Sequence, residues 1–276
     1  MKRPGGRGGT RRESPRFGRE DLAKFYGIQC CLTIFAVRRN EIRRVFVSQE
    51  REEAFRDVIA WAEQRGLPAR VVDSEELGRV AGTEHHEGVC LEAKPLVGRP
   101  PGEVSRLLGE LQRGLVLILE GVENPHNVGA ILRTACFFGV DAVVIRSEGA
   151  QSLSGAACRI AEGAAERLPF CVVPDFGNLF VALKARGYAV IATTPHEARS
   201  VYGVKWPDKM AIVFGAEGPG VSQLVLEGAD IRVAIPRIGA IESLNVAASV
   251  SGVLTEARRE SVLKGTVRRV GALRPS

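Results

Sequence analysis

The sequence lacks the features that mark membrane, secreted and metal-bound proteins. No apolar run approaches the roughly 18 residues that a membrane helix needs, and the N-terminus has no apolar segment typical of a secretory signal. None of the six cysteines forms a C-x-x-C pair, and their apolar neighbours indicate buried, reduced thiols. His85, His86 and Cys90 match no common spacing of zinc ligands. The sequence therefore predicts a cytoplasmic protein without a membrane or metal partner.

Positive charge is concentrated at the two ends of the chain. Residues 1–20 carry a net charge of +5 and residues 264–276 carry +4, whereas the whole chain of 276 residues carries only +6. Residues 1–20 are rich in glycine and arginine and poor in apolar side chains, which predicts a disordered basic tail. A second basic tail is expected at 266–276. Such tails either attract RNA phosphates or serve as solubilising extensions, and their composition alone leaves both interpretations open.

Residues 21–97 are predicted to form a small α/β domain, because strand and helix patterns alternate along them. A short helix after the second strand has Asp73 or Ser74 as its expected cap. Proline and glycine between Pro95 and Gly102 indicate a linker, assigned to residues 98–112, with a short helix at 103–112. In the first domain, helices are expected at 24–37 and 54–65, and strands at 45–47, 69–72 and 88–91.

Residues 113–265 are predicted to form a parallel sheet with helices on both faces. The first strand is not followed by a G-x-G-x-x-G loop, which argues against a dinucleotide-binding Rossmann site. Strands are expected at 115–119, 142–145, 171–173, 188–193, 211–214 and 231–235. Helices are expected near 126–138, 153–166, 175–186, 221–226 and 242–263.

Three segments of this second domain stand out. Residues 123–134 (ENPHNVGAILRT) follow an apolar strand, and residues 213–220 (VFGAEGPG) run from a strand into a glycine-rich turn. In residues 231–258, a strand ends at Pro236 and a long helix opens near Glu242, with Ser243 or Asn245 as its expected cap. In this order the three segments resemble the signature motifs of the SpoU (TrmH) family of RNA ribose methyltransferases.

The resemblance extends to the first domain, whose pieces at 26–28 and 86–89 are similar to the substrate-binding domain of many SpoU enzymes. It implies a SPOUT-type methyltransferase domain, with a parallel sheet and a deep trefoil knot, behind a small RNA-binding domain related to ribosomal proteins. It also implies a homodimer that transfers a methyl group from S-adenosyl-L-methionine to a ribose 2′-hydroxyl of ribosomal or transfer RNA. The alternative is an inactive RNA-binding relative that retains the fold.

The resemblance also implies the site residues. Arg133 would act on the target phosphate and hydroxyl, a role that suits the planar, permanently charged guanidinium group. Glu217 either contacts RNA or cofactor, or caps the helix that follows it. The other catalytic residues implied are Asn127, Ser243 and Asn245. The cofactor-binding residues implied are Thr193, Gly215, Gly218, Ile235 and Leu244.

Overall fold

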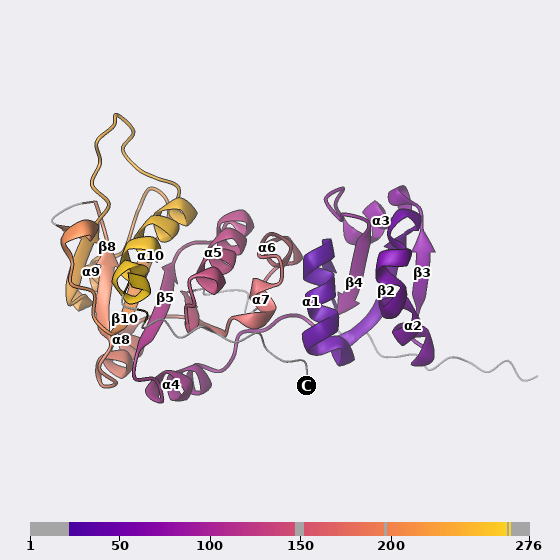
Figure 1. The fold of residues 1–276 in the computed structure, drawn as a ribbon, viewed down its shortest axis with the longest axis horizontal. Coiled ribbons are helices and arrows are strands. Elements are labelled where there is room, and N and C mark those ends of the chain that lie inside the picture. The colour runs from indigo at the N-terminus through magenta and orange to yellow at the C-terminus, as the bar shows by residue number, and fades with distance from the viewer. Residues whose placement is uncertain (1–21, 147–151, 196–197, 264, 266–276) are drawn as a thin grey trace, which may run out of the picture.

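The computed structural model describes residues 22–146, 152–195, 198–263 and 265. These residues form two sheets, one in each half of an elongated molecule (Figure 1). The tails predicted at 1–20 and 266–276 lie outside the described residues.

The N-terminal half contains a mixed four-stranded sheet of order β1-β4-β2-β3. Asp73 caps α3 as predicted, because its Oδ1 accepts a hydrogen bond from the backbone N–H of Glu76 at 2.7 Å. The strands are β1 (Ala23–Tyr26), β2 (Ile42–Ser48), β3 (Ala69–Val72) and β4 (Val89–Ala93). The helices are α1 (Ile28–Arg38), α2 (Arg56–Gln64) and α3 (Ser74–Ala81).

The helix predicted over 24–37 is wrong at its start. Ala23 to Tyr26 pair antiparallel with Ala93 to Cys90 of β4, and this long-range pairing determines the conformation of a segment too short to show a period. Gly27, with φ 91°, then turns the chain into α1, which begins at Ile28.

The second half contains a seven-stranded sheet of order β7-β6-β5-β10-β8-β11-β9, in which every neighbouring pair is parallel. Its strands are β5 (Gly114–Glu120), β6 (Ala142–Arg146), β7 (Phe170–Val173), β8 (Ala189–Thr193), β9 (Arg199–Ser200), β10 (Lys209–Gly215) and β11 (Ile231–Ala234). The helices are α4 (Pro101–Gly109), α5 (Pro125–Phe137), α6 (Gly155–Ile160), α7 (Ala164–Arg167), α8 (Gly177–Lys184), α9 (Gln223–Gly228) and α10 (Val246–Leu263).

All six strands predicted in this half are present, and three details differ. The two-residue strand β9 was not predicted. The helix expected over 153–166 is divided into α6 and α7, because Gly163 adopts φ 84° between them. The last helix begins at Val246 rather than at Glu242, since residues 242–245 are not helical.

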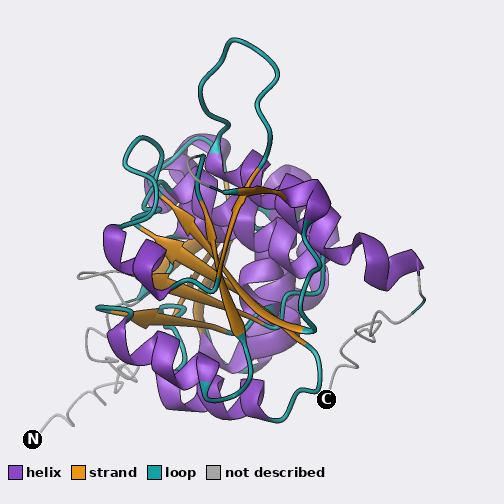
Figure 2. Ribbon diagram, turned by 90° about the vertical axis from the view of Figure 1, so that its left-hand side faces the viewer, coloured by secondary structure: helices purple, strands orange, loops and turns teal. Residues whose placement is uncertain are grey.

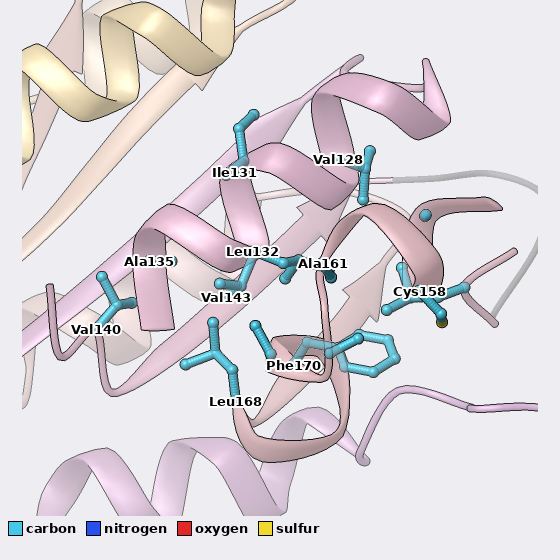
Figure 3. Close-up of a cluster of buried hydrophobic side chains, with 14 of the residues drawn as sticks. Val128, Ile131, Leu132, Ala135, Val140, Val143, Cys158, Ala161, Leu168 and Phe170 are labelled. Carbon is cyan, nitrogen blue, oxygen red and sulfur yellow. The ribbon is translucent and has the colours of Figure 1, made fainter. Parts of the chain in front are cut away.

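Helices cover both faces of the parallel sheet, as predicted (Figure 2). Alternate residues of β5 belong to different apolar clusters: Leu117 packs in the cluster that includes α5, α6, α7 and α10, and Ile118 in the cluster that includes α4, α8 and α9. Figure 3 shows part of the first cluster, where Leu132 of α5 lies with Val143 of β6 and Phe170 of β7. This packing fixes α5, whose first turn follows the carboxyl end of β5.

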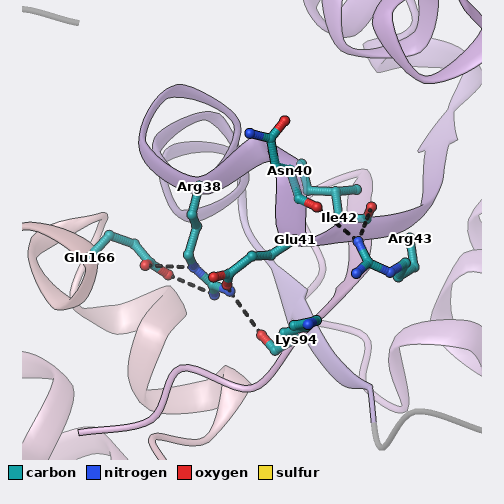
Figure 4. Close-up of polar contacts among 7 residues, drawn as sticks. All are labelled: Arg38, Asn40, Glu41, Ile42, Arg43, Lys94 and Glu166. Carbon is teal, nitrogen blue, oxygen red and sulfur yellow. Dashed lines mark hydrogen bonds and ion pairs between the residues drawn. The ribbon is translucent and has the colours of Figure 1, made fainter. Parts of the chain in front are cut away.

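The two halves are joined by a buried ion pair as well as by a shared apolar core. Arg38 of α1 donates from Nε to Oε2 of Glu166 at 2.8 Å and from Nη2 to Oε1 at 3.0 Å (Figure 4). The two side chains are only 11% and 2% exposed. The same apolar cluster runs from Phe25 in the first half to Leu117 in the second. A bidentate pair of this kind fixes orientation as well as distance.

The six cysteines are free, and all but the half-buried Cys136 are buried. Burial raises the pKa of Cys90 and of Cys158 to about 12. Within the described ranges, no helix combines the length and hydrophobicity that crossing a membrane requires. Among those same residues, no group of three or more histidine, cysteine, aspartate or glutamate side chains is placed to hold a metal ion.

Candidate active site

The candidate site lies at the carboxyl edge of the parallel sheet. Strands β5, β10, β8 and β11 are consecutive neighbours in the sheet. The three segments that the sequence singled out lie at the ends of β5, β10 and β11, and Thr193 is the last residue of β8. Because parallel strands end at the same edge, segments far apart in the sequence meet there. The turns after β8, β10 and β11 surround a cavity of about 460 Å³.

The cavity wall contains all five residues expected to bind cofactor: Thr193, Gly215, Gly218, Ile235 and Leu244. Glu217 and Ser243 lie in the same wall. Apolar side chains form much of the remainder, including those of Phe214, Val246 and Val253. A cavity with apolar walls and a few polar groups suits a small organic ligand.

Gly215 allows the turn after β10 to fold back on itself. A Cβ added there would lie 2.0 Å from the carbonyl carbon of Gly220 and 2.4 Å from the backbone nitrogen of Val221. No side chain fits at that distance, so the backbone of residues 215–220 can itself form a wall of the cavity. Thr193 ties the end of β8 to β10, just before this turn, by donating from Oγ1 to the carbonyl of Val213 at 2.9 Å.

A polar cluster of Asn127, Glu217 and Asn245 lies beside the cavity. Glu217 Oε1 accepts from Asn127 Nδ2 at 3.1 Å and from Asn245 Nδ2 at 2.7 Å. The same oxygen accepts from the backbone N–H of Val246 at 3.2 Å. Asn245 Nδ2 also donates to Asn127 Oδ1 at 2.9 Å. The carboxylate is therefore held at the N-terminus of α10, where the helix dipole favours negative charge.

Asn245, not Ser243, is the side-chain cap of α10. Its Oδ1 accepts from the backbone N–H groups of Ala247 at 3.0 Å and Ala248 at 3.4 Å. Of the two interpretations of Glu217, the one in which it caps the helix that follows is wrong, because α9 is capped by Ser222, whose Oγ accepts from Val225 N–H at 3.4 Å. Glu217 binds the start of the last helix instead.

The structure does not bring Arg133 to this cluster within one chain. Arg133 lies six residues after Asn127 on α5, so the two side chains point to different sides of the helix. Its Nη1 forms an ion pair with Glu162 Oε1 at 2.8 Å, and the side chains are 58% and 46% exposed. The arginine is accordingly available at the surface, on the face of α5 next to α7.

The segment between β11 and α10 was only partly anticipated by the sequence. It projects from the body of the protein in both views (Figures 1 and 2). Within it, Ile238 is 98% exposed and Ile241 is 78% exposed. Arg237 and Glu242 of this segment also line the cavity. Arg237 directly follows Pro236, which ends the predicted strand. Its position in the sequence was therefore the feature from which a charged group at the site could have been predicted.

The family model described as the SpoU rRNA Methylase family matches residues 114–255. The chain belongs to this family. A second family model, for RNA 2′-O ribose methyltransferase substrate binding, matches residues 25–97. The predicted family, enzyme class and S-adenosyl-L-methionine dependence are therefore confirmed.

Individual members of the SpoU family are similar over most of the chain. The 23S rRNA (guanosine-2′-O-)-methyltransferase RlmB of Ralstonia nicotianae is 34% identical over 220 residues, covering 78% of this chain and 86% of its own. A crystal structure described as an RNA 2′-O ribose methyltransferase has a TM-score of 0.69 at 25% identity, covering 87% of this chain and 88% of its own.

The AviRb methyltransferase of Streptomyces viridochromogenes, solved with AdoMet, has a TM-score of 0.69 at 18% identity. The match covers 87% of this chain and 90% of the AviRb chain. The expected fold class, a parallel-sheet methyltransferase domain behind a substrate-binding domain, is confirmed by these likenesses. The trefoil knot stays a prediction.

Proposed function

We propose that this SpoU enzyme methylates the ribose 2′-hydroxyl of a guanosine in 23S ribosomal RNA, and that it works in the cytoplasm as a homodimer. The RNA target is supported by the printed activity of the Ralstonia relative. The observation that carries the proposal is the Asn127–Glu217–Asn245 cluster beside an apolar cavity. We further propose the division into a substrate-binding domain at 21–97 and a methyltransferase domain at 113–265. No observation favours the inactive alternative.

The cavity fits S-adenosyl-L-methionine, which supplies the methyl group on its sulfonium when bound. The side chains of Phe214, Ile235 and Leu244 offer an apolar surface for the adenine ring. The turn at Gly215 exposes backbone groups that no Cβ obstructs, so main-chain atoms of residues 215–220 can hydrogen-bond the ligand. The guanidinium of Arg237 offers a partner for a ligand carboxylate.

Glu217 is proposed to orient the reacting hydroxyl. Three donors occupy its Oε1, and the described residues provide no partner for Oε2, which leaves this oxygen for the ribose 2′-hydroxyl. A ribose hydroxyl is a very weak acid, so a fixed acceptor both aligns it and eases loss of its proton. Asn127 and Asn245 hold the carboxylate in place through their amide groups.

Arg133 is proposed to serve the site of the partner subunit. It lies on an exposed face of α5, and Phe137, one turn further along, is 83% exposed. An exposed aromatic ring beside an arginine is typical of a subunit interface. In a dimer formed through α5, Arg133 can leave its pair with Glu162 and hold the phosphate next to the target ribose bidentately.

The test uses purified protein, radiolabelled S-adenosyl-L-methionine and cellular RNA separated into ribosomal and transfer fractions. Label is expected in the 23S component, at a guanosine whose 3′ phosphodiester resists alkaline cleavage. Label confined to transfer RNA would contradict the proposed target. Cofactor binding by calorimetry without label in any fraction would contradict activity on mature RNA and direct the assay to ribosome precursors. Absence of both cofactor binding and label would support the alternative, an inactive RNA-binding relative.

A further inference from the structure

A second cavity, of about 380 Å³, lies in the N-terminal domain and shares no residue with the cofactor cavity. Its walls are the chain after β2, the start of α3 and the turn before β4. These segments contribute Ser48, Arg51, Asp73, Glu84 and His86, among others. Cavities of roughly 300–1,000 Å³ accommodate small ligands, so the volume suffices for a single nucleobase.

His86 presents an unused hydrogen-bond donor at this cavity. Its Nδ1 accepts from the backbone N–H of Gly88 at 3.0 Å, so the proton of the neutral imidazole is on Nε2. The residue is only 5% exposed, and Nε2 has no partner in the part of the chain that the structure describes. A buried donor without a partner is costly in folded proteins, so a ligand that supplies an acceptor to Nε2 would be stabilised here.

Ser48 repeats the pattern on the opposite strand. The residue is 7% exposed, and its Oγ also has no partner among the described residues. The turn before β4 keeps the two groups together, because Ser48 N–H donates to the carbonyl of Gly88 at 2.9 Å. The Arg51 side chain lies near Ser48 Oγ, because a Cβ added at Gly88 would approach Arg51 Cγ to 2.6 Å and Ser48 Oγ to 2.7 Å.

The charges around the cavity restrict the class of ligand. Glu50, Asp73, Glu84 and Glu87 surround it, with Arg51 as the one lysine or arginine in its described wall. This excess of carboxylates disfavours phosphate, and the unused donors of His86 and Ser48 disfavour a cation. The ligand must therefore supply an acceptor for the two donors and a donor for the carboxylates. A neutral ligand with both a carbonyl and an N–H group does so.

We propose that this cavity binds the lactam edge of an unstacked RNA base, the ring carbonyl and adjacent N–H that guanine and uracil share. The carbonyl would accept from His86 Nε2–H and from the Ser48 hydroxyl, and a carboxylate such as Glu84 would accept from the base N–H. Proteins commonly read RNA through unstacked bases whose edges they hydrogen-bond. The inference rests on the proposed function, since it takes RNA as the substrate.

The base site is held in a fixed relation to the methyltransferase domain. Glu87, in the wall of the cavity, accepts from Arg159 of α6 at 3.0 Å and from the backbone N–H of Ile28 at 3.0 Å. Helix α6 packs against α5, which carries Asn127. Glu87 itself adopts φ 56°, a conformation that side chains rarely adopt and that occurs preferentially at functional sites. An anchored base would therefore set the position of the target ribose.

The first test observes His86 directly in the full-length protein. The ring ¹⁵N signals of the four histidines are assigned with single histidine-to-glutamine variants, and guanosine, uridine, adenosine or cytidine is then added without cofactor. Guanosine, uridine or both are expected to shift the His86 Nε2 signal, and the stronger of the two identifies the base. No shift with any nucleoside, or equal shifts with all four, would overturn the proposal.

The second test uses variants and measures selectivity between bases. Electrostatic attraction to the RNA phosphates is the same for every hexamer, so it cancels in this comparison. Cytidine-rich hexamers with one guanosine, uridine or adenosine are compared in binding to the wild type, Ser48→Ala and Arg51→Ala. Ser48→Ala is expected to reduce the preference for the lactam base about fivefold, the value of one hydrogen bond, without lowering the melting temperature. Arg51→Ala removes a side chain from the cavity wall and should also alter the preference. Arg79→Ala removes the same charge from the exposed end of α3 and should leave the preference unchanged.

An unchanged preference in both cavity variants would contradict the proposal. Methyl transfer is measured on the same wild-type preparation, which separates the two ideas. Methylation without a His86 response would refute the base site alone, and a His86 response without methylation would refute the proposed reaction alone.

Discussion

Glu217 and Val246 are 29 positions apart in the chain, and the carboxylate Oε1 of the first lies 3.2 Å from the backbone nitrogen of the second. This contact joins the glycine-rich turn after β10 to the first residue of α10. The same oxygen accepts from Asn127 and Asn245, so one atom links the three sequence motifs. Variants at the cluster therefore affect both helix stability and chemistry, and paired substitutions are needed to separate the two.

Asn245 caps α10 and also donates a hydrogen bond to Glu217, and two substitutions distinguish these roles. Asn245→Ala removes the cap of α10 and should cost about 1 kcal/mol in the free energy of unfolding. Asn245→Ser keeps a capping oxygen but loses the amide donor to Glu217, so its stability should stay within about 0.5 kcal/mol of wild type. Both variants should lose methyl transfer. Full activity in Asn245→Ser, measured beside urea unfolding, would show that Asn245 acts only as a cap.

Arg133→Ala should fold normally and bind cofactor yet lose methylation. Glu162→Gln breaks the same exposed ion pair, worth at most about 1 kcal/mol, but leaves the arginine and should retain activity.

The role across subunits is tested by mixing Arg133→Ala with Glu217→Gln under conditions that exchange subunits. Each mixed dimer would contain one site with both groups intact, so activity should reappear. A mixture as inactive as its components would place Arg133 in the site of its own chain.

Gly215 is expected to tolerate no side chain. Gly215→Ala places a Cβ 2.0 Å from the backbone of Gly220, which should distort the turn and abolish cofactor binding measured by calorimetry. Gly203→Ala is the matched control, because a Cβ there meets nothing within 4 Å. Wild-type affinity in Gly215→Ala would show that the turn is not part of the cofactor site.

Stability should fall at alkaline pH because of the buried thiols. Burial raises the pKa of Cys158 from the usual 9.0 to about 12, so the folded state keeps its proton while the unfolded state loses it. The contribution of the Cys158 thiol to the free energy of unfolding is fully present below pH 9 and is lost as the pH rises from 9 toward 12. Cys158→Ala should reduce the slope of unfolding free energy against pH in this range. Identical slopes for variant and wild type would contradict the raised pKa.

The strands of the second domain could be predicted because parallel strands buried on both faces are continuous apolar runs between turns. The ends of these strands share one edge of the sheet, which brings together residues such as Thr193, Gly215 and Ile235. This proximity could be predicted because each of these residues lies at or just after the end of a predicted strand. The sequence was less informative where long-range contacts decide conformation. β1 depends on pairing with β4, and β9 has only two residues.

Side-chain partnerships were also beyond the sequence. Nothing local indicates that Glu217 binds the start of α10 rather than that of α9, because the choice depends on how β10 and β11 are placed in the sheet. The ion pair of Arg133 with Glu162 was likewise not predictable, because it depends on how α5 packs against α6 and α7. The burial of the His86 and Ser48 side chains could not be predicted from the sequence, because it depends on how β2 and the turn before β4 pack together.

Single-turnover methyl transfer by Glu217→Gln, at saturating cofactor, tests the proposed active centre most directly. The glutamine carbonyl can still accept from Asn127, Asn245 and Val246, so the variant removes the negative charge and preserves the cluster. Cofactor affinity should stay within about threefold of wild type, and the rate should fall by about a hundredfold or more, as for loss of a positioned acid–base group. An unchanged rate with unchanged cofactor binding would contradict the role of Glu217 and reduce the cluster to a structural tie at the start of α10.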